Sequence, residues 1–279
     1  MLIVADADQY RIIGQTEHAN QVGRIADHWG NDTFDVPPPR VPTITAAYTH
    51  DNGWWEWDLA PELRDGEPVN LLGVAKSEWT TFYDRGIDNA VSIDRYAGLL
   101  VSMHGAGVRR QRYGTQPELP SFTDEYADFV ADEERRQRQL VAEMRDSEQY
   151  GDHVGESTAR SLRTVHETGQ LDREPVALWQ QYKLLQAWDR LSLYCCLNEE
   201  LTAESITPVP SGPDADVELT LDPVDDTTVR IDPYPFETSP LSVPVRCRTI
   251  PRQSYADQSE LTDAYYTAGE DIVPVSFRQ

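Results

Sequence analysis

The sequence predicts a mainly α-helical fold, in which an HD-domain-like helical bundle is followed by a small β-rich C-terminal part. Apolar residues recur at helical spacing over most of residues 16–197. After Glu200 the pattern changes to short runs separated by Asp-Pro and Ser-Pro turns. The 279-residue chain is also long enough to bury a full core. We therefore expect a helical domain at residues 1–205 and a β-rich extension at residues 206–279 packed on it.

The helical part is expected to follow a short strand at residues 2–5. The apolar periodicity predicts helices at residues 16–29, 43–51, 77–89, 92–104, 123–150, 156–167 and 174–197. Gly105 and Gly107 are expected to end the fourth of these helices. The seventh is apolar on nearly every side, so it is expected at the centre of the bundle.

Two further stretches have distinctive compositions. Residues 208–213 are rich in proline and are expected to form a linker. Beyond them, strands are expected at residues 217–221, 228–231 and 241–248, and a short helix at residues 259–267. The charged run from Asp132 to Arg136 is expected to be a solvated helix face with local ion pairs.

The charge balance restricts the classes of partner. Forty-eight acidic residues against 24 basic ones give a formal net charge of −24, and only Lys76 and Lys183 are lysines. Scattered acids with few lysines are typical of a surface adapted to a high-salt cytoplasm, where repulsion is screened; capture of a basic partner is the alternative. A broad basic face for nucleic acid, a membrane span and a signal peptide are all missing from the sequence. We therefore expect a cytoplasmic protein with a small-molecule substrate.

Five polar residues stand at inward positions of the predicted helices. They are His18, His50, Asp51, His104 and Asp189. Buried imidazoles and carboxylates need partners, and a divalent cation satisfies several of them at once. Nitrogen and oxygen donors without a thiolate suit Mn, Fe, Zn or Mg, so we predict a site for one or two such ions. A hydrogen-bonded core histidine at His18 and a salt bridge from Asp189 to an arginine are the alternatives.

Residues near these five are candidates for substrate binding. Arg109, Arg110 and Arg112 form a dense basic run and are expected either to orient phosphate oxygens or to pair with acidic helix faces. Trp54 and Trp57 follow His50 and Asp51 closely along the chain and are expected to contact the substrate.

The order of His18, the His50-Asp51 pair and Asp189 in an Asp-Arg-Leu segment resembles the HD-domain superfamily of metal-dependent phosphohydrolases. The resemblance covers residues 14–200 and implies an all-α fold with these four residues as metal ligands. It implies that His104 is a ligand to a second metal or a substrate contact. The segments Gln-Thr-Glu-His-Ala, His-Asp-Asn-Gly-Trp and Ser-Met-His are also similar to a prokaryotic domain-of-unknown-function family, number 3891 in that series, which implies no activity.

These observations favour a metal-dependent phosphohydrolase that acts on a small phosphate ester or nucleotide. Asp51 would hold the metal and its nucleophilic water, and His104 would donate a proton to the leaving oxygen or stabilise charge. One alternative is an HD-like di-iron oxygenase with an apolar substrate in a tryptophan-lined site. The other is a non-catalytic ligand-binding or interaction domain in which the five residues form a structural polar core.

Overall fold

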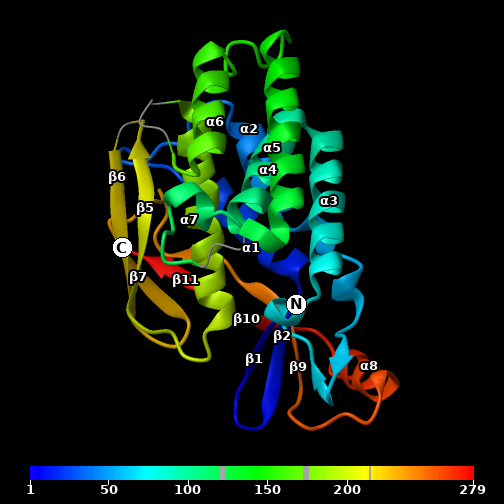
Figure 1. The fold of residues 1–279 in the computed structure, drawn as a ribbon. Helices are drawn as coiled ribbons and strands as arrows, with labels where there is room; N and C mark the ends of the chain where they lie inside the picture. Colours follow the sequence, from blue (N-terminus) through cyan, green and yellow to red (C-terminus); the bar gives the residue numbers. More distant parts are fainter. Residues whose placement is uncertain (120–122, 172–175, 214) are drawn as a thin grey trace.

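Helices form the larger part of the fold, and the predicted helices are present close to their expected positions (Figure 1). The computed structural model describes residues 1–119, 123–171, 176–213 and 215–279. The helices are α1 (Gln15–Asp27), α2 (Arg40–Thr49), α3 (Lys76–Ile93), α4 (Arg95–Val108), α5 (Thr123–Arg145), α6 (Glu156–Thr168), α7 (Ala177–Leu197) and α8 (Gln258–Thr267). The start predicted for α7, Glu174, lies outside the described residues.

The β-strands make this a mixed α/β fold, so the prediction of a mainly helical fold with a small β-rich part is confirmed only in part. The strands are β1 (Leu2–Ala5), β2 (Gln9–Ile13), β3 (Leu63–Arg64), β4 (Glu67–Pro68), β5 (Glu204–Gly212), β6 (Ala215–Pro223), β7 (Thr228–Asp232), β8 (Leu241–Ser242), β9 (Val245–Pro251), β10 (Asp271–Val273) and β11 (Ser276–Arg278). One sheet has the order β5-β6-β7-β11-β8, another β1-β2-β9-β10, and β3 pairs with β4. Figure 1 shows the first of these beside the helices.

The sheet β1-β2-β9-β10 joins the two ends of the chain. Strand β2 pairs antiparallel with β9, so that Tyr10 lies opposite Ile250. Local periodicity contains no signal for a pairing between such distant segments, which is why β2 was not expected. The predicted strand at 241–248 is in fact divided, because β8 belongs to one sheet and β9 to the other.

The stretch predicted as a linker, residues 208–213, lies largely within β5. Pro208 and Pro210 are part of this strand, which stands at the edge of its sheet. The register with β6 shifts between Ile206 and Val209 and again between Pro210 and Gly212. Proline lacks an N–H donor but is tolerated at sheet edges and bulges. These prolines therefore do not end the strand, and the prediction of a linker from them is wrong.

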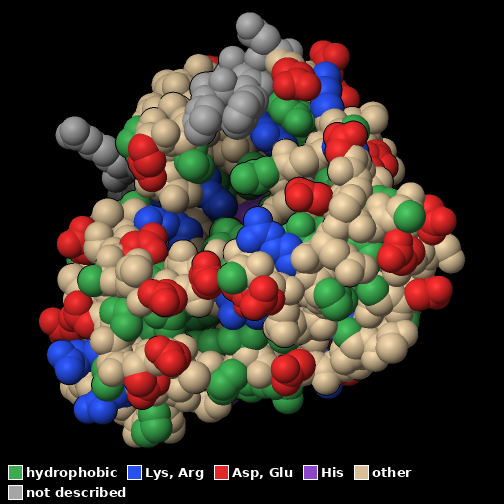
Figure 2. Space-filling view, turned by 90° about the horizontal axis from the view of Figure 1, so that it is seen from below, with side chains coloured by type: hydrophobic (Ala, Val, Ile, Leu, Met, Phe, Trp, Pro, Cys, Tyr) green, Lys and Arg blue, Asp and Glu red, His purple; other side chains and the backbone are tan. Residues whose placement is uncertain are grey.

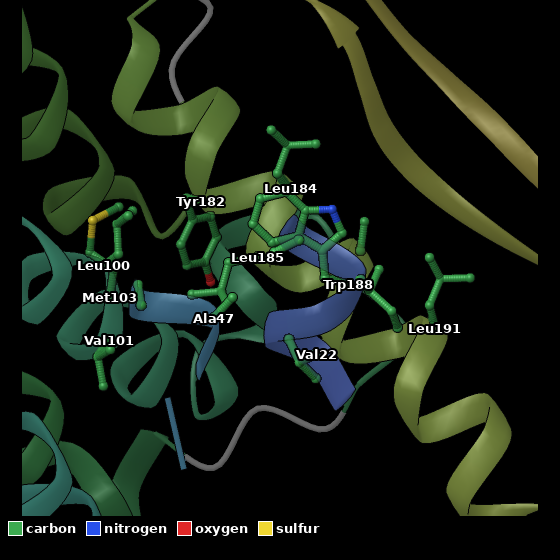
Figure 3. Packing of buried hydrophobic residues seen from close by; sticks show 14 of the residues in the cluster. Val22, Ala47, Leu100, Val101, Met103, Tyr182, Leu184, Leu185, Trp188 and Leu191 are labelled. Carbon is green, nitrogen blue, oxygen red and sulfur yellow. The ribbon is translucent and has the colours of Figure 1, made fainter. Parts of the chain in front are cut away.

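Helix α7 is central, as its composition predicts. It contacts α1, α2 and α4 on one side and β5 on another. Figure 3 shows Leu185 and Trp188 of α7 among side chains of neighbouring helices, including Val22 of α1 and Ala47 of α2. In the part of the chain that the structure describes, no helix is both long enough and apolar enough to cross a membrane.

Helix α4 continues through both glycines that were expected to end it. A Cβ at Gly105 would lie 2.8 Å from a ring atom of Tyr83, and one at Gly107 would lie 2.1 Å from the Tyr182 hydroxyl. These glycines therefore allow side chains of α3 and α7 to lie directly against the α4 backbone. Close packing, rather than helix termination, accounts for them.

The charged run in α5 is only partly solvated. Asp132 and Arg135 form an exposed ion pair, as expected. Glu133 and Glu134 are buried, because they share a face with apolar residues spaced three and four positions along the helix. Ser102 of α4 donates a hydrogen bond of 2.7 Å to Glu133, and burial raises the pKa of this carboxyl to about 7.

Replacing Gly53 by alanine is expected to destabilise the protein by at least about 2 kcal/mol. Gly53 lies in the short helix η1 (Asn52–Trp54), and a Cβ there would lie 1.8 Å from the Phe82 carbonyl oxygen of α3. Gly212→Ala is the control, since nothing lies within 4 Å of its Cβ position. Denaturant unfolding measures both variants, and similar losses in the two would contradict this account of Gly53.

Replacing Glu133 by glutamine is expected to change the pH dependence of stability. The folded-state pKa of about 7 lies above the ordinary value of 4.5, so Glu133 favours folding below about pH 4.5 and this contribution is lost as the pH rises through 7. Glu133→Gln should therefore be more stable than the parent at pH 8 by about 1–2 kcal/mol, with no gain at pH 4. Thermal unfolding at the two pH values measures this, and an equal difference at both would contradict it.

Candidate metal centre

The structure brings the five inward polar residues together where α1, α2, α4 and α7 meet. His18 comes from α1, His104 from α4 and Asp189 from α7, while His50 and Asp51 directly follow α2. Each of the five is buried, with at most 5% of its surface exposed. His50 caps the C-terminus of α2, and the chain then turns into η1. The end of α2 can therefore direct two consecutive side chains toward one point.

Three of these side chains, His18, His50 and Asp51, place donor atoms around the same point, and Asp189 Oδ1 lies beside the two imidazoles. His18 Nε2 lies 3.0 Å from Asp189 Oδ1 and 3.9 Å from Asp51 Oδ2. His50 Nε2 lies 3.4 Å from Asp51 Oδ2 and 3.8 Å from Asp189 Oδ1. Two ligand atoms on a four-coordinate ion with bonds of about 2.1 Å are about 3.4 Å apart. The donors of His18, His50 and Asp51 form a candidate metal-binding group, all within 4.8 Å of one another.

The tautomer of His50 is determined by its backbone contact. Its Nδ1 lies 2.9 Å from the Ala47 carbonyl oxygen, which can only accept, so Nδ1 carries the hydrogen. Nε2 has no hydrogen-bond partner among the described residues, although two carboxylate oxygens lie within 4 Å of it. Nε2 thus faces negative charge. A cation between these groups makes the arrangement favourable, and a histidine held in this way is typical of a metal ligand.

His18 is oriented by a chain of hydrogen bonds on its other side. Ser192 donates to Gln21 Oε1 at 2.6 Å, so its oxygen accepts from His18 Nδ1 at 2.7 Å. His18 Nε2 therefore faces Asp189. Burial opposes a charge on this imidazole, but the hydrogen bond to Asp189 outweighs burial and raises the pKa of His18 to about 10. A divalent ion at Nε2 would take the place of this proton.

The outer oxygens of the two carboxylates have donors of their own. Arg112 Nη2 lies 2.8 Å from Asp189 Oδ2, and the Tyr83 hydroxyl donates to Asp51 Oδ1 at 3.4 Å. Burial opposes the charge on Asp189, but the neighbouring guanidinium holds the pKa of this carboxyl well below its usual range. The salt bridge to an arginine, one of the alternatives for Asp189, is therefore present. It occupies only the oxygen that faces away from the imidazoles.

A left-handed turn carries Arg112 into the site. Gln111, Arg112 and Tyr113 have φ angles of 51°, 47° and 53°. Such a conformation costs about 1–2 kcal/mol for each non-glycine residue. The burial of Arg112 and Tyr113 and the ion pair with Asp189 offset this strain. Strain of this kind is concentrated at functional sites.

His104 lies beside the four inward donors rather than among them. Its ring contacts the edge of His50 with centroids 5.0 Å apart and is stacked with Tyr83 at 6.3 Å. Burial, and then the charge of His50, hold the pKa of His104 well below its usual value, so the ring is neutral. Its Nδ1 has no hydrogen-bond partner within the described ranges.

A pocket of about 320 Å³ gives access to this centre. Its lining contains His18, Asp51, His104 and Asp189, with Arg109 and Arg112. The rest of the wall is largely aromatic and aliphatic, and includes Leu71, Leu72, Val74, Trp79, Tyr83, Val108, Tyr126 and Leu193. Figure 2 shows a hollow in one face of the molecule, with a histidine side chain visible inside and Lys or Arg side chains beside it. The volume is at the low end for ligand sites and suits a small molecule.

The three arginines of the basic run have different positions. The guanidinium of Arg109 lies against the rings of both Trp79 and Tyr126, 3.9 Å from each centroid. Arg112 binds Asp189, and both arginines line the pocket. Arg110 instead pairs with Glu134 of α5 and donates to the His166 carbonyl oxygen at 3.0 Å. The expected pairing with an acidic helix face is therefore met by Arg110, and the orientation of phosphate oxygens stays a prediction for Arg109 and Arg112.

Trp54 and Trp57 lie in the core and are not among the residues that line the pocket. Their rings contact each other with centroids 5.4 Å apart, and Trp54 packs on Phe82 and Tyr83. These tryptophans therefore support Tyr83, which in turn contacts Asp51. Trp79 and Tyr126 do line the pocket, so these aromatic residues can contact a ligand directly.

Several site residues were not singled out in the sequence. Tyr83 and Trp79 are four residues apart on α3, and this helical spacing puts both in the pocket wall. Ser192 follows Asp189 by three residues, so it shares a helix face with the carboxylate and reaches His18. The spacing within each pair could be read from the sequence. The residues that each pair contacts on other helices could not.

The chain belongs to a family described as a protein of unknown function (DUF3891), whose model matches residues 1–252. This confirms the expected family, and the matched range extends beyond the helical part to the end of β9. Comparison with curated proteins and with solved structures found no match. The expected resemblance to the HD-domain superfamily has no support from these comparisons.

Replacing Ser192 by alanine is expected to lower the affinity for a divalent ion about 10- to 100-fold, because His18 loses the acceptor that fixes its ring. Ser102→Ala is the matched control, since Ser102 is equally buried and bonds Glu133 instead. Competition titration of chelator-treated protein with Mn²⁺ or Zn²⁺ measures both variants. Equal losses in the two would show that Ser192 has no specific role in orienting a ligand.

Proposed function

We propose that this chain is a metal-dependent hydrolase that acts on a small phosphate ester. The observation that carries the proposal is the His50 imidazole, whose Nε2 faces two carboxylate oxygens without a hydrogen-bond partner among the described residues. Only a positive charge between these groups makes the arrangement favourable. The donor set of two imidazoles and two carboxylates suits Mn, Fe, Zn or Mg.

His18, His50, Asp51 and Asp189 would hold the ion through their inward atoms. A divalent ion bound there supplies Lewis acidity and lowers the pKa of a coordinated water. Ser192 and the Ala47 carbonyl orient the two imidazoles, and Tyr83 and Arg112 orient the two carboxylates. Each proposed ligand thus has a contact that fixes its direction, as metal ligands in proteins usually do.

Arg109 and Arg112 would bind the phosphate oxygens of the substrate. Both guanidinium groups line the pocket, and contact with the rings of Trp79 and Tyr126 restricts the orientation of Arg109. A planar fork of donors suits a phosphate better than the point charge of a lysine. The aliphatic and aromatic walls would contact the organic part of the ester, and the pocket volume favours a small substrate.

His104 would move a proton at Nδ1. Burial keeps its imidazole neutral, so it starts as an acceptor rather than as the donor expected from the sequence. In this role it would take a proton from the attacking water and return it to the leaving oxygen. The edge-on contact with His50 places this imidazole next to the proposed ion.

The HD-like character of the helical part also stays a proposal. The order of the proposed ligands along the chain is His18, then His50 and Asp51, then Asp189, and α1, α2 and α7 bring them together. The β1-β2-β9-β10 sheet would then be an addition to such a helical core.

A second candidate function is a non-catalytic ligand-binding domain with a structural polar core. It is favoured by the charge balance of the cluster, because Arg112 and a protonated His18 neutralise the two buried carboxylates. In this account the pocket binds a ligand without turnover. Metal content separates the two candidates.

Replacing His50 by alanine is expected to remove bound metal while the helix content stays unchanged. Hydrolysis of a general phosphomonoester such as p-nitrophenyl phosphate should fall by at least about 100-fold, since a ligand matters at least as much as the residues that orient it. His28→Ala is the control, because His28 is exposed at the C-terminal end of α1 and its Nδ1 bonds the Arg24 carbonyl oxygen. Elemental mass spectrometry and circular dichroism measure the two properties. Unchanged metal content in His50→Ala would contradict the proposal.

A further inference from the structure

The two carboxylates of the centre each turn only one oxygen toward the imidazoles. These oxygens are Asp51 Oδ2 and Asp189 Oδ1. A two-metal site has its ions about 3.5–4 Å apart and usually shares a carboxylate between them through both oxygens. The number of ions therefore depends on what holds the outer oxygens.

Both outer oxygens are held by side chains of the protein. Arg112 Nη2 lies 2.8 Å from Asp189 Oδ2, and the Tyr83 hydroxyl lies 3.4 Å from Asp51 Oδ1. His104 is the remaining imidazole beside the centre, and a second ion next to it would need a free carboxylate oxygen. The guanidinium of Arg112 takes Asp189 Oδ2, and the Tyr83 hydroxyl takes Asp51 Oδ1.

Arg112 is fixed in this position from several directions. A second nitrogen of its guanidinium donates to Gln186 Oε1 of α7, the same helix that carries Asp189. Its backbone is held in the left-handed turn, and only 7% of the residue is exposed. A side chain inserted through a sterically unfavourable turn and bound at two points does not leave easily.

We infer that the centre holds one divalent ion and that Arg112 takes the place of a second. This inference rests on the proposed function and decides between the one and two ions that the donor set allows. Arg112 lines the pocket, and its Nε has no hydrogen-bond partner in the described part of the chain. The guanidinium is thus a permanent positive charge that can bind a phosphate oxygen beside the single ion.

Metal stoichiometry tests the inference without a measurement of activity. Chelator-treated protein is reloaded with excess Mn²⁺ in high salt, desalted and analysed by elemental mass spectrometry, with electron paramagnetic resonance to distinguish isolated from coupled ions. The wild type and Arg112→Lys, which keeps the charge, should hold one ion per chain. Arg112→Gln should approach two, with the signal of a coupled pair. Arg110→Gln is the matched control and should hold one, because Arg110 pairs with Glu134 outside the pocket.

The outcomes are distinguishable. Two ions per chain in the wild type would overturn the inference while leaving the proposed metal centre in place. One ion in an Arg112→Gln variant with unchanged circular dichroism would overturn the role given to Arg112. No ion in the wild type would overturn the proposed function, and this inference with it. The wild-type stoichiometry decides the number of ions even if Arg112→Gln does not fold.

Discussion

Asp51 and Asp189 are carboxylates buried among helices whose inward side chains are mostly apolar, and the need to compensate their charge shapes the centre of this protein. An uncompensated charge in such a place is strongly destabilising. The inward oxygens face two imidazoles, and the outward oxygens face Tyr83 and Arg112. Each compensating group comes from a different part of the chain, so the compensation also fixes how the helices are arranged.

The consequences extend away from the carboxylates. For Arg112 to reach Asp189, three residues adopt left-handed backbone angles after α4 ends. For Tyr83 to reach Asp51, its ring must lie against α4, where only glycine at position 105 leaves room. Trp54 packs edge-on against the same tyrosine. Features that look unrelated in the sequence, a strained turn and two glycines in a helix, are thus explained by the packing around one charged centre.

The sequence predicted the parts of this arrangement that depend on local periodicity. His18, His104 and Asp189 were identified as inward-facing because each shares a helix face with apolar residues, and all three are buried. Pairing across the chain was not predictable in the same way. The contact of β2 with β9, and the selection of Arg112 rather than Arg110 as the partner of Asp189, depend on the tertiary fold. The burial of Glu133 within a run of charged residues also depends on the tertiary fold. So does the inclusion of Pro208 and Pro210 in a strand, because they lie at a sheet edge where a missing N–H is tolerated.

The strong negative charge of the molecule restricts how an anionic substrate can be held. A formal net charge of −24 repels a phosphate at low ionic strength, yet at 1 M salt the Debye length is about 3 Å and only groups in contact matter. Under those conditions long-range steering contributes little, and binding depends on charges that touch the ligand. Arg109 and Arg112 line a pocket in a chain whose 24 basic residues are outnumbered by 48 acidic ones; one lies against two aromatic rings and the other is bound to Asp189. Because contact with fixed guanidinium groups survives screening, an acidic surface is compatible with the proposed binding of an anion in this pocket.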